Sequence, residues 1–425
     1  MENDIDTSGV EYFFNPRSIA VLGASTNIEK PGGRPIWALK RKGYPGKIYP
    51  VNPRYDRIDG LPCYPEIAAV PGEVDMAIIS VPIDLIMDML EECANKKVKV
   101  AVVFTSGFAE VGPEGQALQK RMRNLARERG IRILGPNCLG LVYFKTKVMA
   151  SFTDIVDLEP VPPLSLGFVT QSGAFGEKMY IKAMREGVGF STFISVGNEA
   201  DRDFTDFMAY LLDDPDTTVL GGYIEGAKDG AKFRRVAEKA LRLGKPILLK
   251  KVGRTRAGTR AVASHTGSLA GDDQIYDAFF RQMGILRIDE LRELTSFVIA
   301  HRNGRRPRGR NVGILTGSGG EGVVLADKCE SFGLVVPEFT GETREKLKSY
   351  LPFFGSARNP VDMTAAVATD PTIYKKCLQA MADDERIDMV ICPGFFLAPF
   401  ASIVHDALEV CSSTEKPIVL SPVWS

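Results

Sequence analysis

Short apolar runs alternate with longer amphipathic stretches along most of the chain. In the first third, runs rich in Val and Ile occur at SIAVLGAS, KIYPVNP, DMAIISVP, VKVAVVFTSGF and IRILGPN. Between them lie segments with helical periodicity, such as residues 84–96 and 114–129. Continuous apolar runs separated by helices are typical of a parallel sheet that is covered on both faces. This part of the chain is therefore predicted to be an open α/β domain.

The same alternation restarts twice. After the proline-rich DLEPVPPLS come LGFVTQSGAFG, GFSTFISVGNEAD, TVLGGYIEGAKDG and PILLKKVG, and after RNGRRPRGR come NVGILTGSGG, DMVICPGFF and PIVLSPVWS. We predict a Rossmann-like domain over residues 1–145, a second α/β domain over 160–301, a linker over 302–310 and a third α/β domain over 311–425. The third domain stops directly after a strand-like run, so we expect it to be truncated at its C-terminus.

Charge and cysteine content narrow the class of protein. The chain has 53 Lys plus Arg against 53 Asp plus Glu, and this balance argues against binding to nucleic acid or to an anionic membrane. Its seven cysteines are scattered without a C-x-x-C pair, which disfavours a zinc site and a disulfide framework. No run of about 18 apolar residues is present. We expect a soluble cytoplasmic protein that binds small molecules or other proteins.

A glycine-containing turn follows the first predicted strand, at Gly23-Ala24-Ser25. Such turns let backbone amides approach an anion at a helix N-terminus, although an ordinary strand-to-helix turn explains this feature equally well. The G-x-G-x-x-G fingerprint of dinucleotide binding is absent, which disfavours NAD. Lys30 and Arg34 lie within and just after the inserted NIEKP, where they suit a ligand with additional phosphate charge, such as coenzyme A.

Other strand ends would line the same crevice of an open sheet. These are Ser80-Val81-Pro82 and Gly135-Pro136-Asn137, and the two prolines are also compatible with simple strand termination. Asn137 carries a donor and an acceptor in one side chain and is the better candidate for reading an adenine or a pantetheine amide.

His265 is one of three histidines and lies in RAVASHTGSLAGDD, which we interpret as an accessible loop. A neutral imidazole is a competent nucleophile near pH 7 and can accept a phosphoryl group, although an unremarkable loop histidine remains the alternative. The turn Gln171-Ser172-Gly173 precedes a predicted helix whose N-terminus can hold a phosphate. Glu225, at a strand end, can accept a hydrogen bond from one imidazole nitrogen and leave the other free.

Six segments together resemble the NDP-forming acyl-CoA synthetases, the superfamily of ADP-forming acetyl-CoA synthetase and succinyl-CoA synthetase. They are, in order, FFNPRSIAVLGAS, ILGPNCLGL, VTQSGAFG, ISVGNEAD, YIEG and ASHTGSLAG. The resemblance implies a Rossmann-like CoA-binding domain followed by two flavodoxin-like, open parallel-sheet domains. It implies that His265 is phosphorylated with support from Glu225, that Gln171, Ser172 and Gly173 hold phosphate, and that Gly197, Asn198 and Glu199 lie beside the acyl group. The residues implied to lie near CoA are Gly23, Ala24, Ser25, Lys30, Ser80, Val81, Pro82 and Asn137.

The family reaction converts acyl-CoA, phosphate and ADP into carboxylic acid, CoA and ATP through an acyl phosphate and a phosphohistidine. No ATP-grasp pattern is recognisable, so the resemblance implies an α-type chain whose ADP, ATP and Mg²⁺ bind to a partner ATP-grasp subunit or domain. The rival interpretations are a CoA-sensing or acyl-CoA-sensing module of a protein acetyltransferase or regulator and, with less support, an NAD-dependent dehydrogenase.

Overall fold

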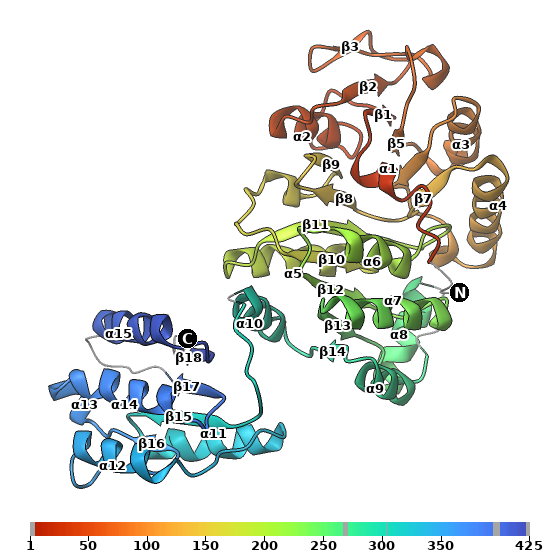
Figure 1. Ribbon diagram of the computed structural model, residues 1–425. Helices are drawn as coiled ribbons and strands as arrows, with labels where there is room; N and C mark the ends of the chain where they lie inside the picture. The colour runs from red at the N-terminus through yellow and green to blue at the C-terminus, as the bar shows by residue number, and fades with distance from the viewer. Residues whose placement is uncertain (1–4, 267–270, 303, 394–399, 422–425) are drawn as a thin grey trace. The chain divides into compact units, whose positions relative to one another are not determined.

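The computed structural model describes residues 5–266, 271–302, 304–393 and 400–421. It divides into two compact units, Met1–Ile299 and Ala300–Ser425. Each unit is built on sheets of mainly parallel strands with helices packed against them (Figure 1), which confirms the predicted α/β class. Among the described residues, no helix is both long and apolar enough to cross a membrane.

The first sheet has the strand order β2-β1-β5-β6-β7, and all its pairings are parallel. Alternate residues of β1 face opposite sides, as they must in a pleated strand. Ile19 and Val21 share one apolar cluster with α2, whereas Ala20 and Leu22 share another with α3 and α4. The elements are β1 (Ser18–Leu22), β2 (Lys47–Val51), β5 (Met76–Ile79), β6 (Val100–Val103), β7 (Arg132–Leu134), α2 (Arg34–Lys42), α3 (Ile86–Asn95) and α4 (Pro113–Arg129), with the short pair β3 (Arg57–Ile58) and β4 (Leu61–Pro62).

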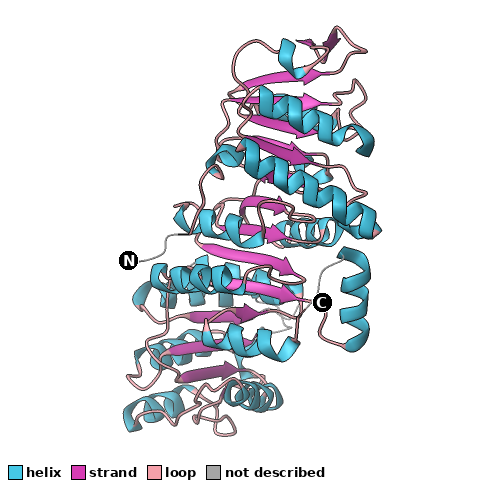
Figure 2. Ribbon diagram, turned by 90° about the vertical axis from the view of Figure 1, so that its right-hand side faces the viewer, coloured by secondary structure: helices cyan, strands magenta, loops and turns pink. Residues whose placement is uncertain are grey.

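The second sheet has the order β14-β13-β12-β10-β11-β8-β9, with β8 and β9 antiparallel to their neighbours. Helices are seen on both sides of the strands in Figure 2. Residues 140–143, which the sequence placed in the first domain, instead extend the second sheet, because β8 pairs with β11. The strands are β8 (Gly140–Tyr143), β9 (Val148–Ser151), β10 (Leu166–Thr170), β11 (Phe190–Ser195), β12 (Val219–Ile224), β13 (Ile247–Lys251) and β14 (Leu286–Arg287).

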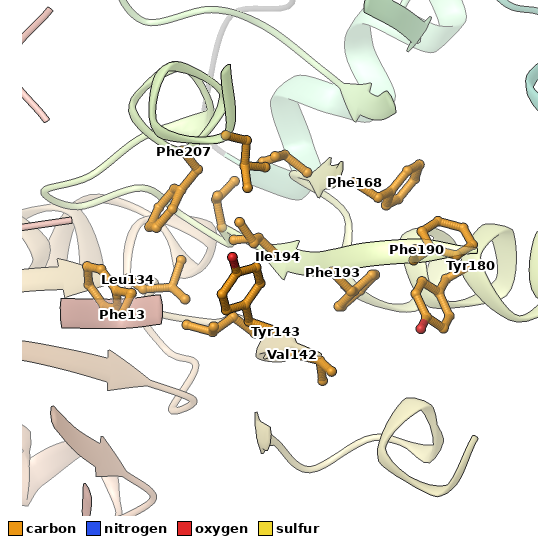
Figure 3. Packing of buried hydrophobic residues seen from close by; sticks show 14 of the residues in the cluster. Phe13, Leu134, Val142, Tyr143, Phe168, Tyr180, Phe190, Phe193, Ile194 and Phe207 are labelled. Atoms are coloured by element: carbon orange, nitrogen blue, oxygen red, sulfur yellow. The ribbon is translucent and has the colours of Figure 1, made fainter. Parts of the chain in front are cut away.

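Aromatic side chains fill the core around the second sheet (Figure 3). Phe14 of the short helix α1 (Glu11–Phe14) stacks on Tyr210 with ring centroids 4.4 Å apart and meets Tyr143 edge-on at 5.2 Å. Both phenylalanines of FFNP are fully buried, so this part of the motif has a packing role. The helices are α5 (Gly173–Arg185), α6 (Phe204–Asp213), α7 (Gly230–Leu243), α8 (Arg256–Thr266), α9 (Asp273–Gln282) and α10 (Leu291–Arg302).

The second unit holds a four-stranded parallel sheet of order β16-β15-β17-β18. Buried side chains of α14, among them Tyr374 and Leu378, share an apolar cluster with β15 and β17. The described elements are β15 (Val312–Thr316), α11 (Gly319–Ser331), α12 (Gly341–Tyr350), β16 (Val361–Asp362), α13 (Ala366–Thr369), α14 (Thr372–Asp383), β17 (Met389–Pro393), α15 (Phe400–Ser413) and β18 (Ile418–Ser421).

Candidate functional site

The first candidate region is the carboxyl edge of the first sheet. The chain leaves β1 for β2 on one side and later crosses to β5 on the other side. In an open α/β sheet such a reversal leaves a crevice between the loops that follow the two strands. Parallel pairing brings Gly23-Ala24-Ser25, Ser80-Val81-Pro82 and Asn137 to this edge, as the sequence predicted.

The loop between β1 and α2 is closed tightly around glycines. Gly23 has a φ of +79°, and a Cβ atom there would lie 2.1 Å from the carbonyl oxygen of Ser80. A Cβ atom on Gly32 would lie 2.1 Å from the carbonyl oxygen of Gly23. Gly33 precedes α2, and no described side chain caps this end of the helix. The backbone amide of Arg34 donates to the carbonyl oxygen of Lys30, and Pro35 has no N–H, so the first two positions of α2 have no free N–H for an anion.

The two cations predicted to meet CoA phosphate differ in their surroundings. The Arg34 guanidinium stacks on Trp37, 4.9 Å from the ring centroid, and forms ion pairs with Asp157 and Asp154 of the short 3₁₀ helix η4 (Asp154–Asp157). Lys30 is exposed, and its carbonyl oxygen accepts hydrogen bonds from the backbone amides of Gly33 and Arg34. Arg34 thus contacts acidic side chains in this structure, while Lys30 faces solvent.

Asn137 lies where the first sheet meets the second. Its backbone has a φ of +56°, and its N–H donates to the carbonyl oxygen of Thr105 at 2.9 Å. Its Nδ2 donates to Oδ1 of Asn198 at 3.3 Å. A Cβ atom on Gly197 would lie 2.3 Å from the carbonyl oxygen of Pro136 and 2.5 Å from that of Asn137. The predicted CoA-side residue and the predicted acyl-side loop are therefore in direct contact.

The loop of Asn198 and Glu199 is anchored by buried hydrogen bonds. Asn198 Nδ2 donates to Glu110 Oε2 at 2.5 Å and to Gln119 Oε1 at 3.1 Å, which ties it to the 3₁₀ helix η3 (Ala109–Val111) and to α4. Glu199 Oε1 accepts from the backbone N–H of Phe204 at 2.8 Å, at the start of α6. Burial raises the pKa of Glu199. These side chains position the loop.

Gln171 connects three strand ends of the second sheet. Its Oε1 accepts hydrogen bonds from the backbone amides of Glu225 at 2.5 Å and Gly226 at 3.2 Å. Its Nε2 donates to the carbonyl oxygen of Gly226 at 2.8 Å and to Glu199 Oε1 at 3.1 Å. The amide of Gln171 therefore sets the relative positions of Glu225 and Glu199, at the carboxyl ends of β10, β12 and β11.

The start of α5 follows Gln171 directly. Ser172 is the residue before the helix and has extended backbone, and its carbonyl oxygen accepts a hydrogen bond from Thr170 Oγ1 at 2.7 Å. A Cβ atom on Gly173 would lie 2.8 Å from Leu139 Cγ, so glycine allows the close approach. No described side chain caps this end of α5. The backbone amides at the start of α5 are the donors that the sequence analysis assigned to phosphate binding.

Three family models match consecutive parts of the chain. A CoA binding domain matches residues 17–143, a succinyl-CoA ligase-like flavodoxin domain matches 163–300 and a ligase-CoA domain matches 312–422. The α subunit of acetate–CoA ligase [ADP-forming] II from Pyrococcus furiosus is 40% identical over 383 residues, which cover 90% of this chain and 81% of that one. The α subunit of isoenzyme I from the same organism is 39% identical over 428 residues, which cover 97% and 90%. The chain belongs to the NDP-forming acyl-CoA synthetase family.

A solved structure supports this assignment. A synthetase from Candidatus Korarchaeum cryptofilum, titled as a dinucleotide-forming acetyl-coenzyme A synthetase in complex with phosphate and ADP, aligns with a TM-score of 0.87 at 34% identity and covers 98% of this chain and 89% of its own. The chain is thus the CoA-binding, α-type part of an NDP-forming acyl-CoA synthetase, an acid–thiol ligase, and a CoA-sensing module is not favoured. It spans 54% of acetate–CoA ligase [ADP-forming] I from Archaeoglobus fulgidus, which is 39% identical.

The backbone of His265 lies in helix α8 of this synthetase chain. The sequence predicted a loop around His265, but the backbone is helical from Arg256 to Thr266, which makes the loop prediction wrong for this stretch. Ala and Arg residues in RAGTRAVASH favour a helix, and they outweigh the Gly and Thr residues among them. The side chain of His265 lies outside the described part of the structure.

Two lysines of the synthetase site were missed by the sequence interpretation. Lys228 Nζ donates to the carbonyl oxygens of Asn198 at 2.7 Å and Glu199 at 2.6 Å, and burial lowers the pKa of Lys228. Lys251, the last residue of β13, is 2% exposed, and burial lowers its pKa to about 8. Each lysine lies at or just beyond the carboxyl end of a strand of the second sheet, where candidate site residues were sought. A lysine at such a position is usually solvated, so its position in the sequence only weakly indicates a buried site residue.

Proposed function

We propose that this chain forms a phosphohistidine at His265 while its synthetase complex converts acyl-CoA, phosphate and ADP into carboxylic acid, CoA and ATP. The observation that carries the proposal is the convergence on Gln171, whose side-chain amide bonds to the Glu225 loop and to the buried Glu199, and which directly precedes Ser172 at the start of α5. These groups lie at one sheet edge in a chain that matches ADP-forming ligase α subunits over most of its length.

The proposed sequence has three displacement steps. An oxygen of phosphate attacks the thioester carbonyl, the C–S bond breaks, and CoA leaves as a thiolate that takes up a proton. An imidazole nitrogen of His265 then attacks phosphorus of the acyl phosphate, and the carboxylate leaves. A β-phosphate oxygen of ADP attacks the phosphohistidine, which forms ATP and regenerates the imidazole. Positioning and charge neutralisation are the main contributions of the protein to such steps.

Each candidate residue has a role in these steps. The Gly23 loop and the ends of β5 and β7 bind CoA, with Lys30 near its phosphates. The amides of Ser172 and Gly173 hold the transferred phosphoryl group at the start of α5. Glu225, 4% exposed, accepts a hydrogen bond from one imidazole nitrogen and balances the charge that develops on the ring. Asn198 and Glu199 shape the space for the acyl group.

A partner ATP-grasp subunit or domain supplies the nucleotide site in this proposal. Mg²⁺ bound there with ADP or ATP would neutralise charge on the transferred phosphoryl group. Three of the matched relatives are named as α subunits, which supports a partner subunit.

The test is transfer of label from γ-³²P-ATP with Mg²⁺ to this chain in complex with its ATP-grasp partner. Wild type is expected to acquire acid-labile, alkali-stable phosphate, and His265→Ala to acquire none. His405→Ala is the matched control, because the His405 side chain is 72% exposed on α15. Label on His265→Ala, or an unlabelled wild type that still binds CoA, would overturn the proposal.

A further inference from the structure

Lys251 is an amino group buried beside the loop of Glu225. It ends β13, and in the parallel register with β12 it pairs with Ile224, the residue before Glu225. Only 2% of Lys251 is exposed, and its Nζ donates a hydrogen bond to the carbonyl oxygen of Val252. Burial of an ammonium group is costly unless nearby groups compensate it. The groups that compensate the buried Lys251 ammonium therefore indicate the role of this residue.

Charged groups from three elements act on this ammonium: Asp273 of α9, Arg287 of β14 and Glu225 after β12. Asp273 already contacts two guanidinium groups, with Arg287 Nη2 at 2.6 Å and Arg254 Nε at 3.6 Å from its oxygens. Arg287 also donates to the carbonyl oxygen of Lys251 at 3.5 Å. Asp273 and, more weakly, Glu225 favour the charged form of Lys251, whereas Arg287 disfavours it.

Tyr276 links Lys251 to the same loop a second time. Lys251 Nζ lies 4.5 Å from the centroid of the Tyr276 ring, a cation–π distance. The hydroxyl oxygen of Tyr276 accepts a hydrogen bond from the backbone N–H of Ala227 at 2.7 Å, two residues after Glu225. Gln171 holds the loop at Glu225 and Gly226, and Tyr276 holds it at Ala227.

We propose that Lys251 is a positioning residue for phosphoryl transfer: its buried ammonium lies against the Tyr276 ring and so holds Tyr276 against the loop of Glu225 after β12. This inference rests on the proposed function. An ionised Glu225 accepts a hydrogen bond from an imidazole N–H and stabilises the positive charge that the ring acquires as its other nitrogen attacks phosphorus. A neutral Lys251 would lose the cation–π contact with Tyr276 and leave the loop of Glu225, and with it the imidazole, less well oriented.

A pH dependence follows from the same arrangement. Burial lowers the pKa of Lys251 to about 8. The ammonium is therefore present below this pH and is lost as pH rises through it. Phosphorylation of the wild-type chain should accordingly slow above pH 8, and an arginine at this position, which stays charged, should remove that decline.

The experiment measures the initial rate of label transfer from γ-³²P-ATP and Mg²⁺ between pH 6.5 and 9.5, in complex with the ATP-grasp partner. The variants are Lys251→Met, Lys251→Arg and the matched control Lys250→Met, which removes the neighbouring lysine whose Nζ donates to the carbonyl oxygen of Asp289. CoA binding, measured by calorimetry, reports on correct folding in every variant.

We expect Lys250→Met to behave as wild type and Lys251→Met to be slower at pH 7 by roughly fivefold, the factor that corresponds to the loss of a cation–π contact of about 1 kcal/mol. Lys251→Arg should restore most of the rate and show no decline above pH 8. A Lys251→Met rate equal to wild type, or a decline in Lys251→Arg that matches wild type, overturns the inference. A wild-type chain that acquires no label would overturn the proposed function itself. That outcome differs from failure of the inference on Lys251, in which the wild type is labelled.

Discussion

Gln171 Oε1 lies 2.5 Å from the backbone nitrogen of Glu225, and this hydrogen bond joins the end of β10 to the end of β12. The sequence assigned Gln171 to phosphate binding, whereas its side-chain amide is occupied by Glu225, Gly226 and Glu199. The amides at the start of α5 remain the candidates for phosphate. Gln171 acts on the site by holding Glu225.

Replacement of Gln171 should therefore loosen the loop of Glu225. Gln171→Ala leaves the Gly226 carbonyl, the Glu199 oxygen and two backbone amides without these partners, so we expect the free energy of unfolding to fall by about 1–3 kcal/mol. The rate of phosphorylation should also fall. Urea denaturation and label transfer measure the two effects. Gln116→Ala, an exposed change on α4, should alter neither, and a Gln171→Ala chain with normal labelling would contradict the role.

The buried carboxyl group of Glu199 predicts a pH-dependent stability difference. Burial raises its pKa, so the folded chain keeps this proton to higher pH than the unfolded chain does. The stability of the folded chain therefore falls as pH rises above the pKa of Glu in the unfolded chain, about 4.3. The fall is complete once pH exceeds the higher pKa of Glu199 in the folded chain. Glu199→Gln cannot titrate, and its stability relative to wild type should increase from pH 4 to pH 8.

Urea denaturation at several pH values tests this expectation for Glu199. The exposed Glu186→Gln provides the control and should show little pH-dependent difference from wild type. A difference between Glu199→Gln and wild type that stays constant or shrinks as pH rises would show that Lys228, 3.6 Å from the carboxylate, outweighs burial.

Gly23 and Gly60 form a matched pair for the CoA loop. Both have a φ of +79°, but a Cβ on Gly23 would lie 2.1 Å from the Ser80 carbonyl oxygen, whereas a Cβ on Gly60 has nothing within 4 Å among the described residues. Gly60→Ala should cost about 1 kcal/mol of stability, from backbone strain alone. Gly23→Ala should cost more and weaken CoA binding at least tenfold, as measured by calorimetry. Equal CoA affinity in the two variants would contradict the assignment of this loop.

Lys30 and Arg34 should differ in their effect on CoA affinity. Lys30 is exposed in the loop, whereas Arg34 contacts Asp154 and Asp157. We expect Lys30→Ala to weaken CoA binding by roughly tenfold, about 1.4 kcal/mol, and to reduce its dependence on salt. Arg34→Ala should have the smaller effect. Lys47→Ala, at the start of β2 and so at the opposite sheet edge, is the control, and a larger loss in Arg34→Ala would reverse the ranking.

The α/β class and the succession of strands and helices along the chain follow from the sequence, because buried parallel strands must be continuously apolar and separated by crossover helices. The runs SIAVL, MAII and VAVV are strands with every residue buried, where the pattern predicted them. Motif order also identified the synthetase family, because the matching loops follow one another along the chain.

The tertiary structure alone decided which side chains share the site. The pairing of β8 with β11 joins residues about fifty positions apart, and no local periodicity specifies that partner. The hydrogen bonds of Gln171 and the burial of Lys251 depend on neighbours from β12, α9 and β14. Apolar periodicity records which residues leave water, whereas hydrogen-bond partners and pKa shifts are set by distances that exist only once the strands are packed.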